Sequence, residues 1–325
     1  MGSDQTSQIA LTIGNFDGVH IGHCALVGRC REAVGSNDQT GDQTGGKVIA
    51  LAFSPHPMMV LNPEQAPGAI EPIEIRIDRL KAAGADEVVV LEPTPELLSM
   101  SAQGFVDHVI DTYHPTVMVE GTDFRFGKRR AGTPTVLKEL ASVRGVEVQI
   151  VPAVEVALTD QSIVKASSTM ARWLIAHGRV RDAGFVLGRP HELIGTVVQG
   201  DQLGRQIGFR TANLKTDSML PCDGVYGVVV VLPDGTEYGG AMNIGVRPTV
   251  DGTERRAEVH VFDADGSPWM PGDGFPEYGW DITVKMIGWV RDQIKFASVD
   301  VLSEQLGRDV VRAKSMVQAM MAETV

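Results

Sequence analysis

The first half of the chain alternates short apolar runs with segments whose apolar residues recur at helical spacing. The runs lie between turn residues and are rich in valine or isoleucine: KVIALAF, DEVVVLEP, PTVMVEG and VEVQIVPA. Two other segments, CALVGRCREAV and SAQGFVDHVIDTYH, carry apolar residues three and four apart, as amphipathic helices do. Strands that alternate with helices predict a parallel sheet with crossover helices. Ligands of such sheets bind beyond the carboxyl ends of the strands.

From about Gly188 onward the pattern changes to short apolar strands separated by glycine, aspartate and proline turns. These strands are ELIGTVVQG, GVYGVVVVLPDG, TEYGGAMNIG, RAEVHVFD and WDITVKMIGWV. Closely spaced strands without helices between them predict an antiparallel barrel or sandwich. The last segment, VDVLSEQLGRDVVRAKSMVQAMMAE, has helical periodicity and predicts one closing amphipathic helix.

The segment between the halves, SSTMARWLIAHGRVRDAGFVLGRP, predicts two short helices. Gly178 and Gly188 are their stop signals, and Pro190 follows the second. Two domains are also the usual expectation for a chain of 325 residues. We therefore expect an α/β domain over residues 1–186 and a β-barrel domain over residues 187–325.

The composition limits which partners the chain can have. A formal net charge of −12, without a lysine- or arginine-rich run, argues against nucleic acid, because binding to phosphate backbones depends on basic surface. Cys24, Cys30 and Cys222 form no CxxC pair, which fits a reducing cytoplasm and argues against a zinc site or a disulfide framework. No apolar stretch reaches the roughly 18 residues of a membrane span. We expect a cytoplasmic protein whose partners are small molecules.

The stretch IGNFDGVHIGHCALV places a glycine-bearing turn between a strand-like run and a helix. Gly14 and Gly18 permit a tight turn, and a helix that begins near His20 presents unpaired amide donors. A phosphate is the natural occupant of such a site. His20 and His23 share one helix face, so both can donate to that anion, whose charge favours their protonated forms. The alternative is a pair of ordinary histidines, and a metal pair is disfavoured because no third ligand lies nearby in sequence.

Two loops at the ends of predicted strands are further candidates. In FSPHP, His56 lies where a parallel sheet exposes its ligand edge, and the alternative is simple turn formation. The loop EGTDFRFGKRRAG mixes acidic, basic and aromatic side chains: Asp123, Phe124, Arg125, Phe126 and Lys128. A loop of this composition could bind an aromatic ring together with a phosphate, although surface loops often mix these residue types.

The motif SSTMAR lies at the start of a predicted helix. Ser167 or Ser168 can cap that helix. Thr169 and Arg172 then lie on one face near its positively polarised start, which makes a second place for anionic oxygens. Capping alone is the alternative interpretation.

HxGH after a strand, with SxTxxR at a distant helix start, resembles the HIGH-type nucleotidyltransferase superfamily, and GNFDGVHIGH with FSPHP and DFRFG resembles its FAD synthetase branch. The resemblance implies a Rossmann-like domain that transfers the adenylyl group of ATP to the phosphate of FMN. That phosphate is itself the nucleophile, so catalysis depends on alignment and charge neutralisation. The resemblance assigns catalysis to His20, His23 and Arg172. It assigns nucleotide and flavin binding to Gly14, Phe16, His56, Asp123, Arg125, Ser167 and Thr169.

The stretch GDQLGRQIGFRTANL, residues 200–214, is a glycine-punctuated loop that ends with small polar residues. Its glycines at positions 200, 204 and 208 permit close backbone approach to a phosphate. Side-chain oxygens of Thr211 and Asn213 suit a Mg²⁺ ion. A barrel hairpin also needs glycines, so an ordinary hairpin is the alternative.

The strand RAEVHVFD alternates between two faces. Ala257, Val259 and Val261 share one face, and Glu258 lies on the other. Glu258 could be a general base aimed at a substrate hydroxyl, and the alternative is a solvated strand carboxylate.

These segments belong to an ordered series that resembles bacterial riboflavin kinase: PCDGVYGVVV, NIGVRPTV, YGWDITV, VRDQIKF and a closing helix with Gln305 and Asp309. The two modules in this order resemble the bifunctional riboflavin kinase and FAD synthetase family over nearly the whole chain. The resemblance implies a six-stranded Greek-key barrel and formation of FMN and then FAD from riboflavin, with two ATP and Mg²⁺. It assigns Mg²⁺ and ATP phosphates to Thr211 and Asn213, nucleotide binding to Gly204, Arg205 and Gly208, and deprotonation of the ribityl hydroxyl to Glu258.

The chain departs from the family's motifs at several positions. GFPTAN is GFRTAN here, so Arg210 replaces a proline whose fixed φ would shape the metal loop. SSTRIR is SSTMAR at Met170, LGRPY is LGRPH at His191, and residues 264–277 resemble an insertion. These departures bear on rate or affinity rather than on reaction type. Two alternatives stay open: a FAD synthetase with an impaired kinase module, and a non-catalytic flavin-binding regulatory protein.

Overall fold

The computed structural model describes residues 8–35, 45–200, 209–249, 252–269, 276 and 278–323. The chain divides into two compact units: Met1–Val156 with Lys165–Ser168, and Ala157–Val164 with Thr169–Val325. The two helices predicted between the halves therefore belong largely to the second unit. The sequence predicts the boundary between the two functional modules near residue 187, after these helices, and that boundary stays a prediction.

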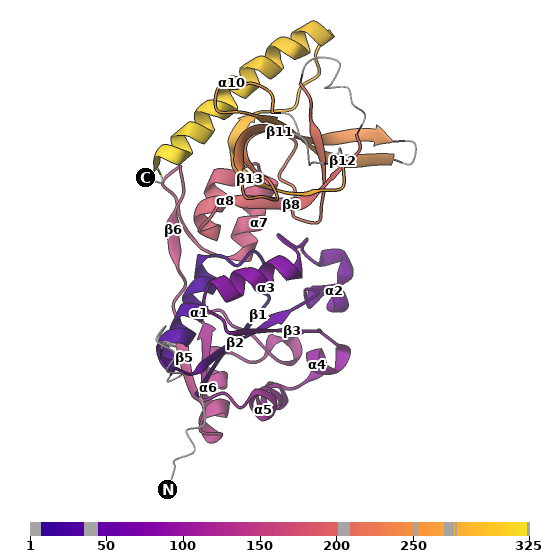
Figure 1. Cartoon of the computed structure of the whole chain (residues 1–325). Coiled ribbons are helices and arrows are strands. Elements are labelled where there is room, and N and C mark those ends of the chain that lie inside the picture. Colours follow the sequence, from indigo (N-terminus) through magenta and orange to yellow (C-terminus); the bar gives the residue numbers. More distant parts are fainter. Residues whose placement is uncertain are drawn as a thin grey trace. The chain divides into compact units, whose positions relative to one another are not determined.

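The first unit is built on a parallel sheet of five strands in the order β3-β2-β1-β4-β5 (Figure 1). The strands are β1 (Ile9–Gly14), β2 (Lys47–Phe53), β3 (Glu87–Leu91), β4 (Val117–Gly121) and β5 (Glu147–Val151). The helices are α1 (Ile21–Val34), α2 (Met58–Leu61), α3 (Ile73–Ala82), α4 (Pro95–Ser99), α5 (Ala102–Tyr113) and α6 (Pro134–Val143), with 3₁₀ turns at Pro63–Gln65 and Lys128–Arg130. The predicted parallel α/β sheet is confirmed, and the carboxyl ends of its strands meet at one edge.

Helices cover both faces of this sheet. On one face, α1 and α3 contribute Val27, Cys30 and Leu80 to the core. On the other face, the packing residues of α5 and α6 are Phe105, Val106, Val109, Ile110, Leu137 and Ala141. Strands covered on both sides need apolar residues at successive positions, which explains why runs such as KVIALAF show no polar alternation. Each fully buried side chain of this size contributes about 1.5–3 kcal/mol.

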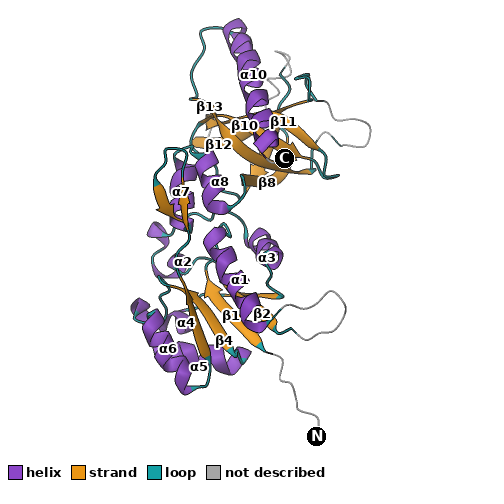
Figure 2. Ribbon diagram, turned by 90° about the vertical axis from the view of Figure 1, so that its left-hand side faces the viewer, coloured by secondary structure: helices purple, strands orange, loops and turns teal. Residues whose placement is uncertain are grey.

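The second unit contains a closed barrel of six strands in the order β10-β11-β12-β9-β8-β13 (Figure 2). They are β8 (His191–Val198), β9 (Ala212–Thr216), β10 (Gly224–Val231), β11 (Glu237–Thr249), β12 (Gly252–Phe262) and β13 (Asp281–Arg291). All six pairs of neighbouring strands are antiparallel. β10, β11 and β12 follow one another as hairpins and β9 lies beside β12, which is the Greek-key order. The predicted antiparallel Greek-key barrel is confirmed.

Two short helices precede the barrel, as predicted: α7 (Ser168–Ala176) and α8 (Val180–Leu187). Gly178 and Gly188 follow them with φ angles of 71° and 75°. Glycine adopts this left-handed conformation without steric cost, so both residues end their helices as the sequence indicates.

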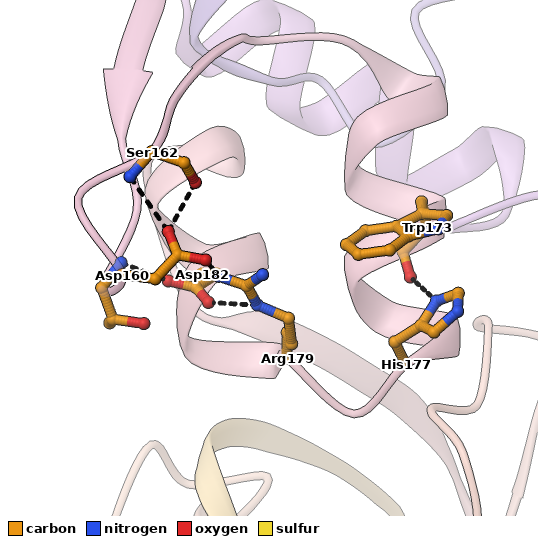
Figure 3. Close-up of polar contacts among 7 residues, drawn as sticks. Asp160, Ser162, Trp173, His177, Arg179 and Asp182 are labelled. Carbon is orange, nitrogen blue, oxygen red and sulfur yellow. Dashed lines mark hydrogen bonds and ion pairs between the residues drawn. The ribbon is translucent and has the colours of Figure 1, made fainter.

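Arg179 holds the corner between α7 and α8 (Figure 3). Its guanidinium donates to the carboxylate of Asp182 at 2.7 Å and to that of Asp160 at 2.9 Å. Asp160 lies in the turn between the short strands β6 (Glu155–Ala157) and β7 (Ile163–Lys165). Hydrogen bonds from Ser162, together with Arg179, lower the pKa of Asp160 to about 2. One charged network therefore joins this turn to the helix corner.

The closing helix α10 (Val299–Glu323) packs on the outside of the barrel, over β10, β11 and β13. Gly227 of β10 allows a close approach, because a Cβ there would lie 3.3 Å from the Cα of Ala313. Arg291, at the end of β13, donates to Asp309 of α10 through Nε at 3.0 Å and Nη2 at 2.8 Å. Asp309 is only 2% exposed and also accepts from Gln305 at 2.9 Å. A buried ion pair thus attaches the helix to the barrel.

Replacing Asp309 with alanine should destabilise the second unit by about 1.5–3 kcal/mol, because the partly buried guanidinium of Arg291 then loses its charged hydrogen-bond partner. Urea unfolding of the full chain measures this change. Glu304→Ala is the matched control on the same helix: its ion pair with Arg308 spans 3.6 Å between exposed side chains, so a change within about 0.5 kcal/mol is expected. Equal losses in the two variants would contradict a special role for the buried pair.

Candidate functional site

The chain turns sharply after β1. Gly18 has a φ of 78°, and two other residues of the turn, Phe16 and Val19, also have positive φ, at 48° and 34°. Gly14 is required for a different reason: a Cβ there would lie 3.3 Å from the ring of Phe16. The Phe16 side chain is fully buried in the core, so Phe16 can meet a nucleotide only through its backbone.

His20 and His23 lie together at the end of this turn. Their rings are stacked, with centroids 3.6 Å apart, and the Phe16 ring meets His23 edge-on at 5.0 Å. His20 is the N-cap of α1, and its Nδ1 accepts the backbone N–H of Gly22 at 3.1 Å. Nδ1 therefore carries no proton in this arrangement, and His20 can donate to a ligand only through Nε2. The sequence predicts that both histidines are protonated and donate to an anion. In this structure His20 offers one donor nitrogen, Nε2, because its Nδ1 accepts a hydrogen bond.

His56 follows β2 and uses its ring in the same way. Its Nδ1 accepts the backbone N–H of Met58 at 3.1 Å, at the start of α2. The turn-forming role that the sequence offered as the alternative is thus present in the structure. The Nε2 position of His56 is not used by this bond, so the ring can form the turn and still donate to a ligand.

Asp17, in the same turn, is a residue that sequence reasoning did not assign. It is 5% exposed, and both its carboxylate oxygens accept the backbone N–H of Ile70, at 2.9 and 3.1 Å. Its carbonyl oxygen accepts the hydroxyl of Ser168 at 2.7 Å. Ser168, which belongs to the first unit, is therefore attached to the glycine turn. Thr169 and Arg172 lie further along α7 in the second unit, and their part in the site stays a prediction.

The loop after β4 contains the other predicted residues of this unit. Asp123 and Arg125 are exposed. The ring of Phe124 stacks on that of Phe126 at 5.3 Å, and Phe126 is buried in the core. Any contact between a flavin ring and an aromatic face of this loop would therefore fall to Phe124. Ser167 is half-buried beside the first residue of α7.

Glu120 is a buried carboxyl group at the end of β4 that the sequence analysis left without a role. It is 1% exposed, and its Oε1 accepts the backbone N–H of Ile13 at 2.8 Å. Burial raises the pKa of Glu120 well above its ordinary value of 4.5, and nearby Asp123 adds to the increase. The side chain thus completes the link between β1 and β4 just before the glycine turn.

The raised pKa of Glu120 predicts a pH dependence of stability. The contribution of Glu120 to the free energy of unfolding is fully present below pH 4.5. It is lost as the pH rises through the elevated pKa of the folded state. Glu120→Gln keeps the acceptor for Ile13 and does not titrate, so the variant should gain stability over the wild type toward neutral pH, by about 1.4 kcal/mol per unit of pKa difference. Urea unfolding of both proteins between pH 4 and 8 tests this. Parallel profiles would contradict it.

In the barrel, two of the predicted kinase residues, Asn213 and Glu258, lie in one row across neighbouring strands, together with Asn243, which the sequence analysis did not assign. Asn213 of β9 is directly opposite Glu258 of β12, which is in turn opposite Asn243 of β11. Directly opposite residues share one face of a sheet. The neighbours Ala257 and Val259 point into the barrel core, so this row lies on the outer face. The strand β9 already begins at Ala212, so Asn213 is a strand residue rather than part of a loop.

His260, two residues beyond Glu258 on the same face, holds the segment that precedes β9. Its Nδ1 donates to the carbonyl oxygen of Arg210 at 2.8 Å, and its ring meets that of Phe209 edge-on at 5.3 Å. Burial lowers the pKa of His260, which favours the neutral form of the ring. Thr211 is the next residue after Arg210, so its position depends on this contact. Gly204, Arg205 and Gly208 lie outside the described residues.

Comparison with known proteins follows the division into two modules. The FAD synthetase family model matches residues 3–168, and the riboflavin kinase model matches residues 187–317. A bifunctional riboflavin kinase/FMN adenylyltransferase of Haemophilus influenzae is 32% identical over 308 residues, covering 94% of this chain and 93% of that protein. The chain belongs to this bifunctional family. The protein of the same name from Bacillus subtilis is 31% identical over 318 residues, covering 94% of this chain and 92% of the relative.

A solved structure also matches along the whole chain. A crystal structure described as a macrolide-efflux protein from Streptococcus pneumoniae is 32% identical and superposes with a TM-score of 0.79, covering 94% of this chain and 93% of that one. Within the described residues of this chain, no helix has the length and apolar character needed to cross a membrane.

Oxygen ligands for a Mg²⁺ ion are available in the barrel row. The Oδ1 atom of Asn213 is buried and accepts no hydrogen bond from the described residues. Amide and hydroxyl oxygens are among the ligands that Mg²⁺ takes, so Asn213, with Thr211 just before β9, fits this ion. Elsewhere, no group of three or more histidine, cysteine, aspartate and glutamate side chains suited to a metal occurs among the described residues.

His191, one of the departures from the family's motifs, has a structural role. The residue is 2% exposed at the start of β8, and its Nε2 lies 2.7 Å from the carbonyl oxygen of Met219. A histidine thus makes a buried hydrogen bond to the connection between β9 and β10. The described part of the segment expected as an insertion, residues 264–269, folds back on β12, where the backbone of Trp269 donates to Val261 at 2.9 Å.

Proposed function

We propose that this chain phosphorylates riboflavin to FMN and adenylylates FMN to FAD, with ATP as the donor in both reactions. The observation that carries the proposal is the presence of two separate constellations, one in each unit. The first unit holds stacked histidines at a helix start, and the second holds an asparagine and a glutamate opposite one another on neighbouring strands. We keep residues 1–186 and 187–325 as the two functional modules.

In adenylyl transfer, a phosphate oxygen of FMN attacks the α-phosphorus of ATP, and pyrophosphate leaves. His20, through Nε2, and His23 donate to the polyphosphate, and the positively polarised start of α1 favours its negative charge. The family resemblance also assigns contacts with anionic oxygens to Ser167, Thr169 and Arg172 of the SSTMAR motif. No covalent intermediate on the protein is needed, because the acceptor phosphate is the nucleophile.

In phosphoryl transfer, the oxygen of the ribityl 5′-hydroxyl attacks the γ-phosphorus of ATP, and Glu258 accepts the proton of that hydroxyl. The bond from that phosphorus to the bridging oxygen breaks, and ADP leaves. Thr211 and Asn213 would hold Mg²⁺, which neutralises charge on the phosphates when bound. Glu258 is half-buried, so its carboxylate is partly shielded from water that would compete for the proton.

Incubation of the purified chain with riboflavin, ATP and Mg²⁺, followed by HPLC, tests the proposal. FMN should form first and FAD second, with one ADP and one pyrophosphate released for each FAD. FAD that forms only when FMN is supplied would support an impaired kinase module, which Arg210 motivates. Flavin binding without release of either product would support a regulatory protein. Replacing Mg²⁺ with EDTA should stop the first step.

A further inference from the structure

Arg76 of α3 lies at the carboxyl ends of β1 and β2. Its Nη1 donates to the carbonyl oxygens of Asn15 at 2.7 Å and Phe53 at 3.1 Å, and its Nη2 donates to the Oγ of Ser54 at 3.2 Å. Asn15 is the first residue after β1, and Phe53 is the last residue of β2, its neighbour in the sheet. One side chain therefore joins the two points at which the chain leaves these strands.

Both histidine-bearing loops begin at these two points. His20 follows Asn15 by five residues, and His56 follows Phe53 by three. Each histidine also uses Nδ1 to accept the backbone N–H two residues further along its own loop. Each ring is thus fixed to its loop, and the separation of the two rings depends on where the loops start.

A second contact attaches the segment before α3, the helix of Arg76, to the glycine turn. Asp17 accepts the backbone N–H of Ile70, and Ile70 lies six residues before Arg76. Arg76 and Asp17 therefore hold the turn from both ends against the segment that leads into α3.

The bonding of Arg76 is unusual for a residue whose role is stability. Arg76 is 6% exposed, and its hydrogen-bond partners are two carbonyl oxygens and a hydroxyl rather than a carboxylate. Its Nε is buried and has no partner among the described residues. Burial lowers the pKa of Arg76, and the carboxylates of Asp17, Glu71 and Glu74 oppose this only through electrostatic attraction, without a hydrogen bond to the guanidinium. A buried charge held in this way is expensive and adds little net stability.

We propose that Arg76 is a positioning residue for adenylyl transfer, which holds the loops of His20 and His56 in register against the nucleotide. The inference rests on the proposed function of the first unit. Arg76 does not touch substrate in this account. It acts only through the backbone of the two loops.

The test compares Arg76→Met and Arg76→Lys with the wild type in the full chain, using the riboflavin kinase activity of the same preparation as an internal control. For Arg76→Met, the kcat of FMN adenylylation should fall at least about tenfold, because misplaced loops cost alignment in the transition state. The KM for ATP should change less than the kcat, and FMN formation from riboflavin should stay within about twofold. Arg76→Lys should recover part of the kcat, because an ammonium reaches one acceptor but cannot join both loops.

Arg144→Met is the matched control in the same unit. Arg144 pairs with Asp107 and Asp111 on the surface and precedes the amino end of β5, whereas the histidine loops follow the carboxyl ends of β1 and β2. Its loss should therefore leave adenylylation unchanged. Full adenylylation in Arg76→Met would overturn the inference, and so would an equal loss in Arg144→Met or an equal loss of kinase activity. If Arg76→Met does not fold, a soluble Arg76→Lys with wild-type kcat would overturn it instead. A wild-type chain without adenylylation would overturn the proposed function together with this inference.

Discussion

Glu258→Ala should abolish the formation of FMN from riboflavin while leaving the conversion of supplied FMN to FAD intact. Removal of a general base costs about 10²–10⁴-fold in rate. The loss should fall on kcat, because the carboxylate acts on the proton that moves in the transition state and contributes little to holding ATP. HPLC of flavins from the two half-reactions, each started with its own substrate, measures the separation.

Glu237→Gln is the control for Glu258→Ala. Glu237 is a carboxylate on a neighbouring strand, paired with Lys285 at 2.6 Å, and it is the first residue of β11, whereas Asn243 lies in the middle of that strand. Its substitution removes a partly exposed ion pair without touching the row that contains Glu258, so FMN formation should be unchanged. A Glu258→Ala protein that still makes FMN at the wild-type rate would exclude Glu258 as the base.

His23→Ala should have the reverse effect: FMN accumulates from riboflavin, and FAD formation falls by about 10²–10³-fold. His23 stacks on His20, so its removal takes away one donor and also the surface that orients the second ring. Both effects act on the polyphosphate site of the first unit. Steady-state assays of FMN adenylylation with ATP varied measure the loss.

His108→Ala provides the comparison for His23. His108 is an exposed histidine on α5 in the same unit, and its loss should leave FAD formation at the wild-type rate. If His23→Ala removed both activities equally, the two sites would not be independent. A thermal unfolding curve of each variant separates a local effect from loss of the fold.

Local patterns were sufficient to predict the elements that carry these sites. The apolar runs of the first half are the strands of the parallel sheet, the glycines that end α7 and α8 have positive φ, and the closing segment is one helix. Residues close in sequence, such as His20 and His23, are brought together because a helix turn fixes their spacing. Glu258 and Asn213 lie far apart in sequence, and only the strand register makes them neighbours.

The supporting residues could not be found in this way, because their partners are backbone groups far along the chain. Arg76 is 61 residues from Asn15, Glu120 is 107 from Ile13, and His260 is 50 from Arg210. A backbone partner, whether N–H or carbonyl, leaves no residue-type signal in the sequence. A weak signal does exist for Arg76, since it occupies the apolar stripe of its helix between Ile73 and Leu80. Glu120 likewise interrupts an otherwise apolar strand.

The loop before β9 shows how a sequence departure can be compensated. Proline would fix φ at position 210, and an arginine leaves that backbone freer. In this chain the carbonyl of residue 210 is held by His260, from the strand that also carries Glu258. The loop and the base are therefore attached to one strand, which gives a physical reason to expect a working kinase in spite of Arg210.

If the two sites of one chain are independent, FMN made at one site of one molecule can be used at the other site of a second molecule, and a mixing experiment tests this. Glu258→Ala and His23→Ala proteins are each incubated with riboflavin, ATP and Mg²⁺, alone and together. Neither variant alone should produce FAD, and the mixture should produce it, because FMN made by the His23→Ala protein is adenylylated by the Glu258→Ala protein. A mixture that accumulates FMN without FAD, or that makes no flavin nucleotide, would contradict the account.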